Sequence, residues 1–110
     1  MQVSDNGGVT RVALAGRLDT AIVNGTEPEF FGAIVPRGQN AVIDLSGVTF
    51  IASLGIRMLL STARALGKSG ARFVLFGAGP AVAEIIETTA LDTIIPVVST
   101  ESEAYAVLAG

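Results

Sequence analysis

Ser53 is the residue whose type and position most clearly suggest chemistry. It lies in the segment FIASLG (residues 50–55), between an apolar stretch at residues 41–45 and an amphipathic stretch that follows. This order predicts a hydroxyl at a helix N-terminus, where free backbone N–H groups and the positive end of the helix dipole favour an anion. A phosphate on Ser53 would be accommodated there and would add about two negative charges. The position suits a switch better than an active site; the alternative interpretation is that Ser53 is only the N-cap.

A cation follows Ser53 on the same predicted helix face. Arg57 comes four residues later, a spacing that brings side chains together on a helix. Its guanidinium is suited to pairing with a phosphate or with a carboxylate of a partner. The alternative interpretation of Arg57 is a solvated surface cation.

The composition argues against an enzyme. The 110 residues include no Cys and no His, which excludes disulfides, thiolate metal ligands and a Ser-His-Asp arrangement within the chain. Asp19, Asp44 and Asp92 are not paired at short spacing. The GAG segment at residues 77–79 lacks the third glycine of a dinucleotide-binding motif, and no P-loop pattern is present. We therefore expect no catalytic residues, cofactor or metal, and we keep a small enzyme and a nucleotide-binding sensor only as remote alternatives.

Charge and hydropathy restrict the partners. The net charge is −3 and charged residues make up 15% of the chain, below the usual ~25%. This low share fits either a surface partly covered by an interface or a domain rich in Ala and Gly. We expect no nucleic-acid partner and no membrane insertion, because there is no basic patch and no apolar run near the ~18 residues of a membrane span. The N-terminus does not resemble a signal peptide, so a cytoplasmic location is expected.

Turn signals and hydrophobic periodicity predict one α/β domain over residues 1–110. An Asn-Gly-Gly turn at residues 6–8 predicts an N-terminal hairpin. The remaining pattern alternates strands and helices, which predicts a mostly parallel sheet of four to five strands with about four helices. The expected strands are 1–3, 9–15, 41–45, 71–76 and 94–98, and the expected helices are 21–34, 53–68, 81–89 and 99–108.

Several details of this prediction are open to test. Residues 16–20 should leave the sheet, with Asp19 or Thr20 capping the next helix. That helix contains Gly25, Pro28 and Gly32, so one helix and two short pieces are both open. Loops that follow the carboxyl ends of parallel strands share one edge of the sheet, which should bring residues 19–20 near Ser53.

Four residues have expected local roles. Asp44 should organise the polar loop after its strand by hydrogen bonds. Pro96 favours an edge position for the last strand. Thr100 and Glu103 have the spacing of a capping box.

The chain resembles the STAS domain family, particularly the bacterial anti-sigma factor antagonists. Residues 16–19, GRLD, resemble the Gly-x-Leu-Asp segment of that family. Residues 44–51, DLSGVTFI, resemble its Asp-Leu-Ser-x-Val-x-Phe-Ile run, and residues 52–55, ASLG, occupy its switch loop. The resemblance covers nearly the whole chain.

The resemblance implies a partner and a switch. Such proteins bind an anti-sigma factor, often a serine kinase of the histidine-kinase-like type, and so free a sigma factor. The kinase phosphorylates a hydroxyl in the switch loop and weakens binding, and a serine phosphatase reverses this. Carried over to this chain, the phosphorylation candidate is Ser53. The expected partner-binding residues are Asp19, Thr20, Ser53, Leu54, Gly55 and Arg57.

The switch loop departs from the family pattern. The family commonly has Asp-Ser-Ser/Thr-Gly with the acceptor hydroxyl just before Gly, whereas this chain has Leu54 there and Ala52 at the Asp position. A shift of one residue at a helix start turns a side chain by about 100°. The alternatives are an antagonist that phosphorylation does not switch, a scaffold or sensor, and a non-phosphorylated docking module of a membrane lipid or anion transporter complex.

Overall fold

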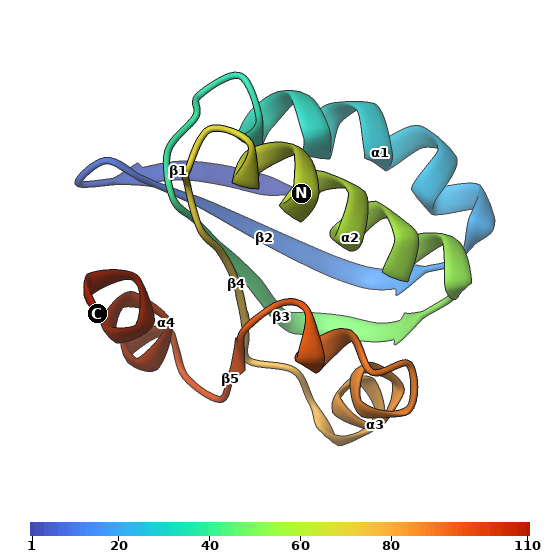
Figure 1. Ribbon diagram of the computed structural model, residues 1–110. Coiled ribbons are helices and arrows are strands. Elements are labelled where there is room, and N and C mark those ends of the chain that lie inside the picture. The colour runs from blue at the N-terminus through green and yellow to red at the C-terminus, as the bar shows by residue number, and fades with distance from the viewer.

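The chain begins with a hairpin and continues with alternating helices and strands (Figure 1). The computed structural model describes residues 1–110. The sheet order is β1-β2-β3-β4-β5, with β1 (Gln2–Asn6) antiparallel to β2 (Val9–Leu18) and all other neighbours parallel. The other strands are β3 (Ala41–Ile51), β4 (Phe73–Phe76) and β5 (Val97–Val98). The predicted α/β fold, hairpin and mostly parallel sheet are confirmed.

Four helices complete the fold. They are α1 (Thr20–Ile34), α2 (Ser53–Gly67), α3 (Pro80–Thr88) and α4 (Glu101–Ala109), with a short 3-10 turn, η1 (Leu91–Thr93), after α3. Helices α1 and α2 lie side by side on one side of the sheet, and α4 lies on the opposite side (Figure 1).

Two apolar clusters hold these layers together. The larger one joins β2 and β3 to α1, α2 and α3, and includes Leu18, Ile51 and Leu59. Phe30 of α1 meets Phe73 edge-to-face with ring centroids 6.3 Å apart, a favoured aromatic geometry. The smaller cluster seats α4 on the other face of β3 and β4 through Val42, Val74, Phe76 and Ala104.

The predicted C-terminal ends of β2 and β3 were wrong. β2 continues through residues 16–18 and β3 through residues 46–51, which were predicted to be loops. The parallel pairing tolerates register shifts after Ala13 and after Gly16, and such bulges keep an irregular strand in the sheet. Gly47 permits this pairing, because a Cβ there would lie 3.2 Å from the Cβ of Ala15.

The other boundaries differ less. β1 is longer than predicted, whereas β5 is only Val97–Val98. Ile94, which was expected in this strand, is instead the C-cap of η1 and has helical backbone angles. β5 is an edge strand, as Pro96 predicted. The capping box of Thr100 and Glu103 is confirmed.

Helix α1 is one continuous helix although it contains Gly25, Pro28 and Gly32. Val23, Phe30 and Ile34 are buried on its inner face, and this tertiary packing outweighs local propensity. Pro28 is exposed inside the helix. Because proline has no N–H, the helical hydrogen bond to the carbonyl of Asn24 is absent.

A network of charged side chains fastens α4 to the sheet; we call it the α4 clamp. Arg11 Nη2 lies 2.9 Å from Asp44 Oδ2, and Arg11 Nε lies 2.8 Å from Glu101 Oε2. The Tyr105 hydroxyl donates to Glu101, and the Asn6 amide donates to that hydroxyl. The α4 clamp consists of these five side chains: Asn6, Arg11, Asp44, Glu101 and Tyr105.

The α4 clamp lowers the pKa values of its carboxyl groups. The hydrogen bond from Arg11 holds the pKa of Glu101 below its ordinary value of 4.5. Burial of Asp44 opposes ionisation, but hydrogen bonds from Ser46 and the ion pair with Arg11 outweigh it and keep the pKa of Asp44 below 3.8. The Ser46 N–H donates to Asp44 Oδ1 at 2.9 Å. The predicted hydrogen bond between Asp44 and the residues that follow it is confirmed, but these residues belong to β3 and not to a loop.

Candidate functional site

Two turns meet at one edge of the sheet because the strands before them end in register. Leu18, the last residue of β2, pairs with Ile51, the last residue of β3. The Ala52 N–H then donates to the Leu18 carbonyl at 2.9 Å. Asp19 and Ala52 follow these residues directly, which places the two predicted contact loops side by side.

The first of these turns is closed by a side chain. Asp19 has extended backbone angles, and its Oδ1 accepts a hydrogen bond from the Ile22 N–H at 3.1 Å. Asp19 is therefore the N-cap of α1, one of the two capping residues expected. Thr20 is the first helical residue and is exposed. Asp19 thus stabilises α1 whatever else it contacts.

The second turn has the same backbone shape but no cap. Its N-cap position is Ala52, with φ −83° and ψ 173°, and no side chain caps this end of α2. The first turn of α2 also contains no acidic residue. The interpretation of Ser53 as the N-cap was wrong, because Ser53 is the first residue inside the helix and is exposed. Free N–H groups at this end favour an anion.

Gly55 has a structural role behind this turn. It is buried, and a Cβ there would lie 2.7 Å from Ile51 Cγ2 and 3.0 Å from the Leu18 carbonyl oxygen. Only a residue without a side chain lets the first turn of α2 approach the ends of β2 and β3 so closely. Gly55 therefore positions Ser53, while its contact with a partner stays a prediction.

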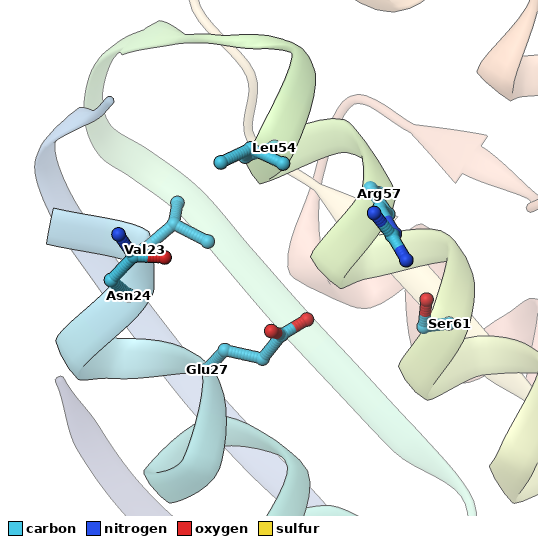
Figure 2. Close-up of a pocket in the computed structure, with 6 residues that line it drawn as sticks. All are labelled: Val23, Asn24, Glu27, Leu54, Arg57 and Ser61. Atoms are coloured by element: carbon cyan, nitrogen blue, oxygen red, sulfur yellow. The ribbon is translucent and has the colours of Figure 1, made fainter. Parts of the chain in front are cut away.

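Leu54 points into a groove between α1 and α2, and Arg57 lies on the α2 wall of that groove (Figure 2). The groove has a volume of about 270 Å³. We call it the α1–α2 groove; its lining residues are Val23, Asn24, Glu27, Leu54, Arg57 and Ser61.

Four of these residues were not predicted to be functional. Val23 and Glu27 are four residues apart and share a face of α1, and Arg57 and Ser61 do the same on α2. The sequence therefore indicates which residues lie together on each helix. The sequence does not reveal that the two helices pack side by side, which is why Val23, Asn24, Glu27 and Ser61 were missed.

The charges in the α1–α2 groove are unpaired. Glu27 projects from α1 toward α2, and Arg57 lies on the facing helix (Figure 2). Both are exposed, and the ion pairs of the structure involve only Arg11. This leaves an anion and a cation available on opposite walls of one groove.

The structure shows neither a cluster of metal ligands nor a membrane-spanning helix. No group of three acidic side chains is placed to hold a metal ion. None of the helices combines the length and the apolar character that crossing a membrane requires.

Known proteins resemble this chain over almost its whole length. The anti-sigma-F factor antagonist RsfB of Mycobacterium tuberculosis is 31% identical over 103 residues, covering 93% of this chain and 83% of the relative. The crystal structure of an anti-sigma factor antagonist from Mycobacterium paratuberculosis superimposes with a TM-score of 0.89 and 33% identity, covering 99% of this chain and 92% of that one.

The fold itself extends to a different class of protein. The STAS domain of a SulP transporter from Vibrio cholerae matches with a TM-score of 0.69 and 20% identity, covering 92% of this chain and 80% of that one. The sequence pattern of the STAS domain matches residues 1–104. This chain therefore belongs to the STAS domain family.

Proposed function

We propose that this chain is an anti-sigma factor antagonist. It binds an anti-sigma factor, a serine kinase of the histidine-kinase-like type, and so frees a sigma factor. In this role it is a ligand and a kinase substrate instead of an enzyme, and it acts in the cytoplasm. The support from known proteins is the 31% identity to RsfB over 93% of this chain.

The observation that carries the proposal is the uncapped start of α2. Ser53 is exposed at the first position of a helix whose N-cap is Ala52 and whose first turn has no acidic side chain. A phosphate on Ser53 would meet unpaired N–H groups and the positive end of the helix dipole. The turn is therefore built to accept an anion that its own sequence does not supply.

The proposed mechanism is a change of charge in a contact patch. Unmodified, Ser53 and Leu54 present a small, partly apolar surface, with Asp19 and Thr20 beside them. A phosphate adds negative charge and a desolvation cost to this patch. Arg57, one turn further along α2, is within the spacing that allows pairing with that phosphate. The phosphorylated form therefore binds the anti-sigma factor more weakly, and a serine phosphatase restores binding.

A pair of substitutions tests the switch. Ser53→Asp is expected to weaken binding of the cognate anti-sigma factor at least about tenfold, roughly 1.4 kcal/mol, because it mimics part of the phosphate charge. Ser53→Ala should leave the affinity unchanged within a factor of about two. Titration calorimetry measures both. Equal affinities for the two variants would remove the switch from the proposal.

A pull-down identifies the partner and the acceptor in one sample. The wild-type protein is recovered from extract of its own cells, and phosphorylated sites are mapped in bound and unbound fractions. The proposal expects a histidine-kinase-like anti-sigma factor in the bound fraction and phosphate on Ser53 in the unbound one. Phosphate at another residue would transfer the switch away from Ser53.

One observation favours a second function. Leu54 occupies the position where the family usually carries its acceptor hydroxyl, and Leu54 faces the α1–α2 groove (Figure 2). A docking module of a membrane lipid or anion transporter complex needs no phosphorylation. Recovery of a transporter complex in the same pull-down, with no phosphate on the protein, would establish this alternative.

A further inference from the structure

We propose that the α1–α2 groove is a specificity-determining docking site for a segment of the anti-sigma factor that carries a basic side chain next to an acidic one. The inference rests on the proposed function and extends its contact surface beyond the two turns. Glu27 receives the basic side chain, and Arg57 receives the acidic one. None of the residues expected from the family pattern lies on the α1 wall of this groove.

The two walls of the groove carry opposite charges. On the α1 wall, Glu27 is a carboxylate acceptor, and Asn24 carries an amide that can donate or accept a hydrogen bond. On the α2 wall, Arg57 is a pure donor and Ser61 carries a hydroxyl. A segment with charges of both signs is complementary to these walls in one orientation only.

A small apolar part of the groove lies next to the proposed switch, while most of its lining is polar. Val23 is buried and Leu54 is half-buried, and both line the groove. Leu54 also adjoins Ser53 in the chain, so the groove is continuous with the proposed switch. A segment that lies across Leu54 therefore reaches Glu27 and Arg57 while its neighbouring residues meet the start of α2.

The openness of the groove favours a protein segment over a free small molecule. Asn24, Glu27, Arg57 and Ser61 are all exposed, whereas small-molecule sites bury most of their ligand. A partner protein that covers the groove would bury these side chains. Removal of water then strengthens the pairing of Glu27 and Arg57 with charges of the partner.

Charge reversal at Glu27 tests the groove directly. Affinity for the purified cognate anti-sigma factor is measured by calorimetry with unphosphorylated protein. Glu27→Lys is expected to weaken binding at least about tenfold, because it repels the basic side chain. The matched control is Glu29→Lys, which makes the same charge change at an exposed position of the same helix outside the groove; its affinity should stay within a factor of about two of wild type.

A more conservative variant, Glu27→Gln, separates an effect on binding from an effect on folding. Glu27→Gln removes the charge and keeps the shape, so it is expected to weaken binding a few-fold and to reduce the dependence of affinity on salt. Circular dichroism of each variant establishes that the helices are intact.

The possible failures are distinguishable. If wild-type protein binds and Glu27→Lys weakens binding no more than Glu29→Lys does, the groove is not a docking site and the proposed function stands. If wild-type protein binds no anti-sigma factor, the proposed function fails and the groove assignment fails with it.

Discussion

Helices α1 and α2 start side by side in nearly the same backbone geometry, yet their first turns differ in one respect. The Asp19 side chain caps α1 by accepting a hydrogen bond from the Ile22 N–H, whereas Ala52 provides no side-chain cap for α2. The strands before them end in register at Leu18 and Ile51, so the surroundings are closely matched. The difference shows that an uncapped helix start is not imposed by this fold, since the neighbouring turn accommodates a cap.

Helix α4 extends the comparison to the other side of the sheet. Its start has a complete capping box, and the α4 clamp pairs its Glu101 with Arg11. Charged groups at α4 are thus paired within the protein, whereas Glu27 and Arg57 form no ion pair and the start of α2 has no side-chain cap. We therefore propose that α4 mainly stabilises this small domain, while the side of the sheet that carries α1 and α2 binds the partner.

The largest expected effect comes from disturbing the close approach of the first turn of α2 to the ends of β2 and β3. Gly55→Ala should lower the free energy of unfolding by roughly 2–3 kcal/mol, because its Cβ overlaps Ile51 and approaches the Leu18 carbonyl. Urea denaturation measures the change. Gly25→Ala in α1 is the matched control, since nothing lies within 4 Å of a Cβ there; it should be neutral or stabilise by up to about 1 kcal/mol. Equal effects at both positions would contradict the close approach of α2.

Opening the α4 clamp should have the next largest effect. Arg11→Gln is expected to lower stability by about 1–2 kcal/mol near neutral pH, because Asp44 and Glu101 lose a shared cation. Urea denaturation over a range of pH checks this.

The pH dependence of that loss has a definite sign. The folded-state pKa values of Glu101 and Asp44 are lowered from 4.5 and 3.8, so the stabilisation is complete above these ordinary values and disappears as the pH falls through the lowered ones. The difference between wild type and Arg11→Gln should therefore shrink as the pH falls below 4.5 and then below 3.8. A difference that stays constant as the pH falls well below 3.8 would assign the effect of Arg11 to packing.

The smallest expected effects come from substitutions at the N-cap positions of α1 and α2. Asp19→Ala should destabilise by about 1 kcal/mol, and Ala52→Asp should stabilise by up to about the same amount. Asp19→Asn is the control that keeps a capping side chain. Thermal unfolding resolves changes of this size as shifts of several degrees. If Ala52→Asp gains nothing, the N–H groups of α2 are already satisfied and the comparison with α1 loses its basis.

The elements of the fold were predictable where local signals agree. The Asn-Gly-Gly turn specified the hairpin, and the spacing of Thr100 and Glu103 specified the start of α4. The ends of β2 and β3 were not, because their last residues remain in the sheet through pairing across the chain, with register shifts that no local pattern records.

The candidate site was predictable only in part. Ser53 and Asp19 were placed at one edge of the sheet from the rule that parallel strands share it, and the structure brings the two turns together. The capping state of each turn depended on single residues that the sequence left ambiguous. The groove residue Glu27 and the clamp residue Arg11 derive their surroundings from tertiary packing, so their roles were not readable in advance.

The α4 clamp also bears on the order in which the chain folds. Arg11 and Glu101 are 90 residues apart in the sequence, and Asn6 and Tyr105 are 99 apart. Closing a loop of this length early carries an entropic penalty that no single contact offsets, so we expect these bonds to form after the central strands have associated. Interactions that form after the rate-limiting step of folding act mainly on the unfolding rate. We therefore expect the clamp to prolong the lifetime of the folded domain and the sheet to determine how quickly the domain folds.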